Sequence, residues 1–242
     1  MRPFVVALLG PVFSLMTAGS APAATVTVLP SDPTWFEFKG LPDSVAQITA
    51  ANPRSGNSSV ELENAGALIG HDIPLGTFGG LNALSFEWFI ASFTDPDGFG
   101  RSLPPELALR VYDFGDPRSF FLHWDSCSPA VGCAARPVGL WQNTDLIGLL
   151  SIQQAENNPP PASLNDIPLD APITEVHLRT SFSFGGPWHG FVDNVTLGFT
   201  GEAPITYNFE TAVPEPGTLP LLGAGVAGIV AILSRRRRHS HR

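Results

Sequence analysis

The chain has 242 residues and a formal net charge of −9, because 22 aspartates and glutamates outnumber 13 lysines and arginines. Nucleic-acid binding needs clustered positive charge, so an acidic chain whose one lysine is Lys39 argues against that function. Glycine and proline occur 24 times each and break the whole chain into short segments, which argues against a fold of long helices.

The N-terminus has the three parts of a secretory signal peptide. Arg2 supplies a positive charge, Phe4–Met16 is an apolar stretch, and Ala21-Pro22-Ala23 has the small-x-small pattern of a cleavage site. We therefore predict a signal peptide over residues 1–23, with cleavage after Ala23 or Ala24 and export of the rest.

Residues 24–212 are predicted to form an all-β ectodomain. Apolar and polar residues alternate along several short segments, as they do in half-buried strands. The apolar positions of these segments are Val60 and Leu62; Leu84, Phe86, Trp88 and Ile90; Leu107, Leu109 and Val111; Phe120, Leu122 and Trp124; Val176, Leu178, Phe182 and Phe184; and Val195, Leu197 and Phe199. Further strands are expected at Trp35–Phe38, Val45–Ala50, Leu146–Ile152 and Ile205–Phe209. About ten short strands separated by turns favour a two-sheet antiparallel β-sandwich.

Two segments in the middle of the chain offer further chemistry. The segment Asp95-Pro96-Asp97-Gly98 resembles a calcium-binding loop, although it lacks the full series of EF-hand oxygen ligands. The same residues are also typical of an ordinary turn. Cys127 and Cys133 lie six positions apart in a loop rich in proline and glycine. Export places them in an oxidising compartment, so we expect a disulfide between them rather than a zinc site.

Two segments near the ends of the ectodomain are Trp35-Phe36-Glu37-Phe38 and Gly190-Phe191-Val192-Asp193-Asn194-Val195-Thr196-Leu197. They resemble the first and last strands of jelly-roll modules, which include many carbohydrate-binding modules and galactose-binding-like domains. In such modules the acidic residues at these two places often hold a structural calcium. The resemblance therefore implies a calcium site at Glu37 and Asp193, on strands that we expect to pair with each other.

The residues give an independent reason to examine Asp193. Alternation places this carboxylate on the inward face with Phe191 and Val195, where it must be paired, hydrogen-bonded or bound to a metal. Two carboxylates with backbone carbonyls would suit Ca²⁺. The alternative is that Asp193 caps a turn through backbone N–H groups.

No common enzyme motif is found in the sequence. It contains no Gly-x-Ser-x-Gly, no His-Glu-x-x-His and no phosphate-binding glycine loop. Aromatic side chains beside polar groups could instead bind sugar rings. The candidates for such a platform are Trp141, Trp188, His189, Tyr112 and Phe121, each of which could equally be a core residue.

The C-terminus combines three features in a fixed order. Val213-Pro214-Glu215-Pro216 comes first, an apolar segment over 219–233 follows, and Arg235-Arg236-Arg237-Arg238 comes last. From Pro216 to Ser234 the chain is just long enough to cross a bilayer as a helix, and the arginines would stay on the cytoplasmic side. This order resembles the PEP-CTERM sorting signal of Gram-negative bacteria.

The resemblance implies that residues 213–242 are recognised by an exosortase, a membrane transpeptidase-like enzyme. Cleavage near Pro-Glu-Pro would then release the protein from the inner membrane to the cell surface or the exopolysaccharide matrix. We therefore expect a non-catalytic exported protein that acts in adhesion or in association with extracellular polysaccharide. A surface hydrolase acting on matrix sugars and a purely structural coat component remain as alternatives.

Overall fold

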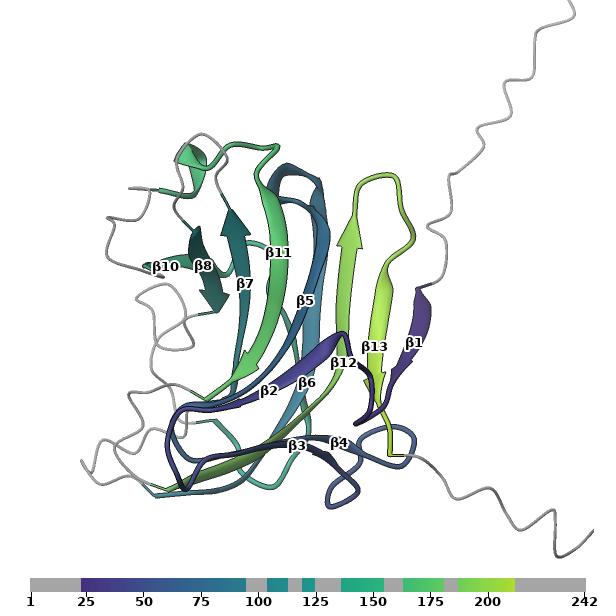
Figure 1. The fold of residues 1–242 in the computed structure, drawn as a ribbon, viewed down its shortest axis with the longest axis vertical. Coiled ribbons are helices and arrows are strands. Elements are labelled where there is room, and N and C mark those ends of the chain that lie inside the picture. The colour runs from purple at the N-terminus through teal and green to yellow at the C-terminus, as the bar shows by residue number, and fades with distance from the viewer. Residues whose placement is uncertain are drawn as a thin grey trace, which may run out of the picture.

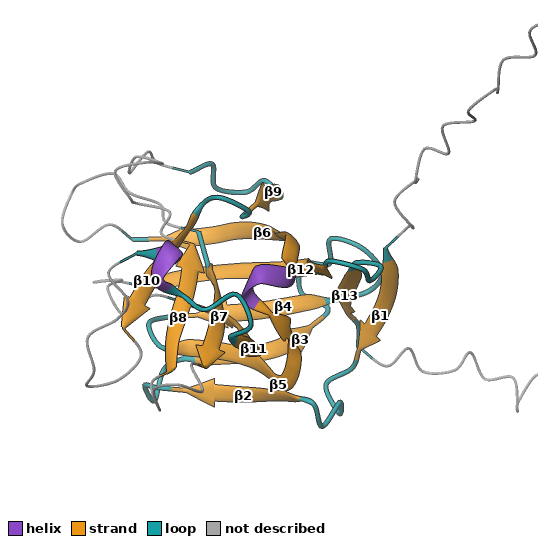
Figure 2. Cartoon of the chain, turned by 90° about the horizontal axis from the view of Figure 1, so that it is seen from above, coloured by secondary structure: helices purple, strands orange, loops and turns teal. Residues whose placement is uncertain are grey.

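The computed structural model describes residues 23–94, 104–112, 119–124, 136–154, 163–180 and 187–211. These residues form an all-β sandwich of two sheets, which confirms the predicted fold class (Figure 1). Thirteen strands are present in the described residues, together with two 3₁₀ turns at Phe78–Gly80 and Leu164–Asp166. Figure 2 shows these two turns as the helical elements beside the strands.

The first sheet has seven strands. Its order is β1-β13-β12-β4-β3, and β6 pairs with β12 and also with β9. The strands of this sheet are β1 (Ala24–Val28), β3 (Val45–Thr49), β4 (Ser59–Glu63), β6 (Leu81–Phe93), β9 (Gln142–Asp145), β12 (Trp188–Phe199) and β13 (Ile205–Phe209).

The second sheet has six strands in the order β10-β8-β7-β11-β5-β2. They are β2 (Trp35–Lys39), β5 (Ala67–Thr77), β7 (Glu106–Tyr112), β8 (Ser119–Trp124), β10 (Leu150–Gln154) and β11 (Pro172–Arg179). Among the strands described in both sheets, neighbours run antiparallel with one exception, the parallel pair of β1 and β13.

The core lies between the sheets and follows the predicted alternation. Phe86 and Trp88 of β6 meet Trp124 of β8 across the sandwich, with ring centroids 5.8 and 6.3 Å apart. Trp124 is 2% exposed, and burial of one such ring contributes roughly 4 to 6 kcal/mol of transfer free energy. The apolar period of the sequence therefore identified the inward faces of β4, β6, β7 and β8 correctly.

Three details differ from the sequence-based prediction. Strand β2 pairs with β5 in the six-stranded sheet, so it does not pair with β12, the strand of Asp193. The strand expected from Leu146 begins at Leu150, because a turn precedes it. Strands β1, β5 and β9 were not predicted, and in the long strand β5 the reason is that Gly70, Pro74 and Gly76 obscure the alternation.

Several predictions lie outside the described residues. These are the signal peptide up to residue 22, the Asp95–Asp97 turn, the Cys127–Cys133 disulfide, the strand positions Phe182 and Phe184, and the C-terminal segment 213–242. In the part of the chain that is described, no helix is long and apolar enough to cross a membrane.

Candidate functional site

A β-bulge in β12 determines the position of Asp193. Asp193 lies opposite Glu87 and Thr196 lies opposite Ser85, so two residues of β12 face one residue of β6. Asn194 takes a left-handed φ of 49° at this point, which asparagine tolerates better than most residues. Val192 before the bulge and Val195 after it both point into the core, whereas Asp193 is on the outer face of the sheet.

The predicted alternation at Asp193 was therefore wrong, although the prediction of a buried carboxylate is confirmed. The side chain is fully buried. It is covered by the loop between β3 and β4, whose Ser55 donates to Asp193 Oδ2 from its backbone N at 3.1 Å. The backbone N–H groups of Asn194 and Phe209 donate to Oδ1 at 2.8 and 3.4 Å.

Burial also affects the ionisation of this group. Desolvation raises the pKa of the Asp193 carboxyl from 3.8 to about 6, although the hydrogen bonds from Ser55, Asn194 and Phe209 act in the opposite direction. The residue is therefore largely ionised at neutral pH, but at a cost in folding free energy that a bound cation would remove.

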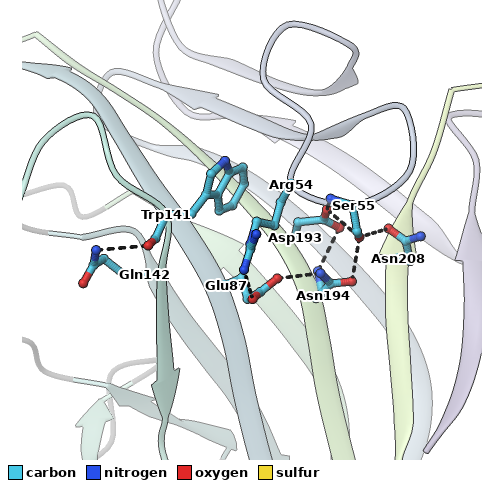
Figure 3. A network of polar contacts seen from close by, with 8 residues as sticks. All are labelled: Arg54, Ser55, Glu87, Trp141, Gln142, Asp193, Asn194 and Asn208. Atoms are coloured by element: carbon cyan, nitrogen blue, oxygen red, sulfur yellow. Dashed lines mark hydrogen bonds and ion pairs between the residues drawn. The ribbon is translucent and has the colours of Figure 1, made fainter.

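Three side-chain oxygen atoms converge on this carboxylate, and together with Asp193 Oδ2 we call them the oxygen cluster (Figure 3). Ser55 Oγ lies 3.2 Å from Asp193 Oδ2. The same hydroxyl lies 3.1 Å from Asn194 Oδ1 and 3.1 Å from Asn208 Oδ1. A hydroxyl carries one proton and can satisfy one of these three acceptors at a time.

Neighbouring carboxylates hold both amides in this orientation. Asn194 Nδ2 donates to Glu87 Oε2 at 2.6 Å, and Asn208 Nδ2 donates to Glu210 Oε1 at 2.9 Å. The amide oxygens therefore point toward Ser55 and cannot turn away without losing these bonds. The four oxygens therefore share the single proton of the Ser55 hydroxyl, and a group of oxygens with so few protons is an environment that suits a hard cation.

Glu37 does not take part in this cluster. It is an exposed residue of β2, opposite Ile69 in the other sheet. Within the described residues, no three histidine, cysteine, aspartate or glutamate side chains are grouped as a metal site. The oxygens that surround Asp193 come from Ser55, Asn194 and Asn208 instead, and two of these lie more than 130 positions apart in sequence.

On its solvent side the cluster continues into a surface patch. Arg54, whose side chain is 46% exposed, pairs with Glu87 at 3.2 Å. Glu87 and Phe89 lie two positions apart on the outer face of β6. Trp141 packs on Phe89 at 5.6 Å, Phe89 on Phe191 at 6.1 Å, and Phe191 on His189 at 4.9 Å. These four residues form the Trp141 row on the outer face of the seven-stranded sheet.

A second line of rings crosses the outer face of the six-stranded sheet. Phe36 of β2 meets His177 of β11 at 5.9 Å, and His177 meets Phe121 of β8 at 5.0 Å. The Arg179 guanidinium lies 5.3 Å from the centre of the Phe121 ring. We call these four residues the Phe121 row. A Cβ at Gly70 would lie 2.5 Å from Phe36 Cζ, so this glycine lets the Phe36 ring lie across β5.

Charged side chains flank the Phe121 row. Arg110 pairs with Glu175 at 2.7 Å, and Arg179 pairs with Glu106 at 3.1 Å. Glu175 also contacts His177 Nε2 at 2.6 Å. Burial lowers the pKa of the His177 imidazole despite this carboxylate, so the ring is neutral at pH 7 and donates to Glu175. Phe36 and Phe38 at the edge of this face are 38% and 52% exposed.

The predicted aromatic platforms lie in the core, in the two rows and at the end of β7. Trp188 is 1% exposed and points into the core, so that ring cannot meet a ligand. Phe121 belongs to one row, Trp141 and His189 belong to the other, and Tyr112 is half-buried at the end of β7. Phe36 was missed as a platform, although its outward position could be inferred from alternation with Trp35.

Comparison with known proteins confirms the nature of the C-terminal segment. Residues 212–238 match the PEP-CTERM protein-sorting motif, which indicates a secreted protein processed at the cell envelope. No curated protein is a significant match to the chain.

Among solved structures, similar folds occur in β-sandwich carbohydrate-binding modules. One is a family 11 carbohydrate-binding module from Clostridium thermocellum in complex with a β-1,3-1,4-mixed-linked tetrasaccharide, with 13% identity over 69% of this chain and 89% of that one, and a TM-score of 0.44. Another is the family 11 module of the Clostridium thermocellum cellulase Lic26A-Cel5E, with 12% identity over 74% and 91% of the two chains and a TM-score of 0.43. These values are too low to transfer a ligand to this protein.

Proposed function

We propose that this protein is an exported surface or matrix protein that an exosortase sorts by its C-terminal tail, and that its sandwich associates with extracellular polysaccharide without catalysis. The observation that carries the proposal is the PEP-CTERM motif at residues 212–238 next to a β-sandwich. In this account the protein is a substrate of the sorting enzyme, and a membrane helix over 219–233 holds it until cleavage.

The Phe121 row is the surface we assign to polysaccharide. Sugar rings bind proteins by stacking on aromatic faces while charged and polar groups bind their hydroxyls. Phe36 and Phe121 belong to strands that are four positions apart in the sheet, but both rings pack on His177, so their centroids lie at most about 11 Å apart. This span suits a short oligosaccharide better than a single sugar. The ion pairs of Arg110 and Arg179 hold both guanidinium groups at the surface beside these rings.

Binding can be tested with the secreted form of the protein and a panel of neutral and acidic polysaccharides. We expect saturable binding that Phe121→Ala weakens, while Leu140→Ala, which changes an apolar side chain 60% exposed elsewhere, leaves it unchanged. Absence of binding across the panel would favour a structural coat component. Release of reducing sugar from any bound polysaccharide would favour the surface hydrolase.

We further propose that the oxygen cluster binds Ca²⁺. Asp193, Asn194, Asn208 and Ser55 would supply oxygen ligands, and the ion would neutralise the buried carboxylate and fix the β3–β4 loop to the sheet. This role stabilises the fold and involves no chemistry on a substrate. Melting curves with calcium and with EDTA test it, and equal melting temperatures would contradict it.

A further inference from the structure

The folded domain holds the chain firmly up to the residue before the sorting tail. Asn57 Nδ2 donates to the Thr211 carbonyl at 3.1 Å, and the Thr211 backbone N donates back to Asn57 Oδ1 at 3.1 Å. The side-chain amide thus imitates a neighbouring strand. We call this pair of bonds the Asn57 clasp.

The two residues before Thr211 are fixed in the same way. The Glu210 backbone N donates to the Val28 carbonyl of β1 at 2.8 Å, and its carboxylate accepts the Asn57 backbone N at 2.7 Å. Ser58 Oγ donates to the Phe209 carbonyl at 2.8 Å. Gly56, at a φ of 63°, lies so close to Glu210 that a Cβ there would be 1.4 Å from Oε1.

Covalent geometry then sets how far the sorting motif can lie from the domain. Val213 follows Thr211 by two residues, so their Cα atoms are at most about 7 Å apart. The apolar segment from residue 219 begins at most about 28 Å from Thr211 by the same rule. Pro214 and Pro216 further restrict the backbone of the motif. An enzyme that holds the motif in its active site must therefore meet the end of the sandwich.

We propose that this end, formed by residues 53–57 and 209–211 together with Leu29, is the surface that the exosortase covers during sorting. The proposal rests on the sorting function proposed above and adds the part of the domain that the enzyme contacts. Pro53, Arg54 and Gly56 are exposed, and Leu29 is 37% exposed, so the surface is accessible. The turn between β12 and β13 lies at the other end of β13 from Thr211, as Figure 1 shows, and would face away from the enzyme.

The experiment uses the full-length chain in cells that make the exosortase. A photo-crosslinking amino acid replaces Arg54 in one variant and Glu202, an exposed residue of the β12–β13 turn, in the control. We expect crosslinking to the exosortase from position 54 at several times the level from position 202. Insertion of ten glycine and serine residues after Ala212 should remove that difference while cleavage continues.

The outcomes separate this inference from the sorting function. Cleavage with equal crosslinking from both positions would overturn the contact and leave the sorting function intact. A tail that stays uncleaved in the unmodified protein would overturn both. If position 54 still crosslinked more strongly than position 202 after the insertion, the short chain between Thr211 and the motif would not be the cause of the contact.

Discussion

The outer faces of the two sheets use their polar side chains in different ways. On the seven-stranded sheet a loop covers Asp193, and the side-chain oxygens around it face one another, with no exposure of the carboxylate. On the six-stranded sheet the charged groups are paired along a line of rings whose outermost member, Phe36, is 38% exposed. The buried and hydrogen-bonded carboxylate contributes to the stability of the fold, whereas the partly exposed rings of the Phe121 row offer contact area to a ligand. Changes on the first face should therefore alter melting, and changes on the second should alter binding.

The largest expected effect is that of Asp193→Ala. The substitution leaves the buried N–H groups of Ser55, Asn194 and Phe209 without their acceptor. We expect a loss of roughly 3 to 5 kcal/mol in the free energy of unfolding, measured by chemical denaturation. The calcium-dependent rise in melting temperature should disappear as well. A loss below about 1 kcal/mol would show that the buried carboxylate is not a stabilising acceptor.

The pH dependence of stability gives the next effect. The folded-state pKa of the Asp193 carboxyl is raised from 3.8 to about 6, so the folded state binds this proton more tightly than the unfolded state. The resulting contribution to the free energy of unfolding is fully present below pH 3.8 and is lost as the pH rises through 6. In EDTA, the wild type should lose up to about 3 kcal/mol of stability between pH 4 and pH 7 relative to Asp193→Asn. Calcium should reduce this difference, since a cation favours the ionised carboxylate. Parallel curves for the two proteins in EDTA would contradict the raised pKa.

The two aromatic rows can be compared directly with Phe121→Ala and Phe89→Ala. Loss of a stacking ring should weaken polysaccharide binding by roughly tenfold in the first variant, in keeping with about 1 to 1.5 kcal/mol per aromatic contact. The second variant should bind like the wild type. Calorimetric titration of both proteins decides the matter, and a larger effect of Phe89→Ala would move the binding surface to the Trp141 row.

The smallest effect is expected from Gly70→Ala. The added Cβ would displace the Phe36 ring, which lies 2.5 Å from that position, but the ring is at the far end of a side chain that can move. We expect binding to weaken two- to threefold with little change in melting temperature. In a protein that already carries Phe36→Ala, Gly70→Ala should not weaken binding further, because the ring that the added Cβ would displace is absent.

Strands β4, β6 and β8 were predictable because their buried apolar residues follow a period of two, as in Leu84, Phe86, Trp88 and Ile90. The outward position of Asp193 was not predictable. One extra residue at Asn194 reverses the alternation, and no local sequence rule marks the bulge. Ser55 and Asn208 were missed for a different reason. Pairing of distant strands brings them together, and a single serine or asparagine carries no spacing signal. Glu37 does not lie beside Asp193, because β2 joins the other sheet.

The most direct test of the account is the intact mass of the protein recovered from the extracellular matrix of cells that make the exosortase. The account predicts a chain that begins near Ala24 and ends near Val213–Pro216, without the apolar segment and the arginines at 235–238. The same cells without the enzyme should retain the tail in the membrane fraction. Recovery of the full-length chain from the cytosol, with both termini intact, would contradict the account.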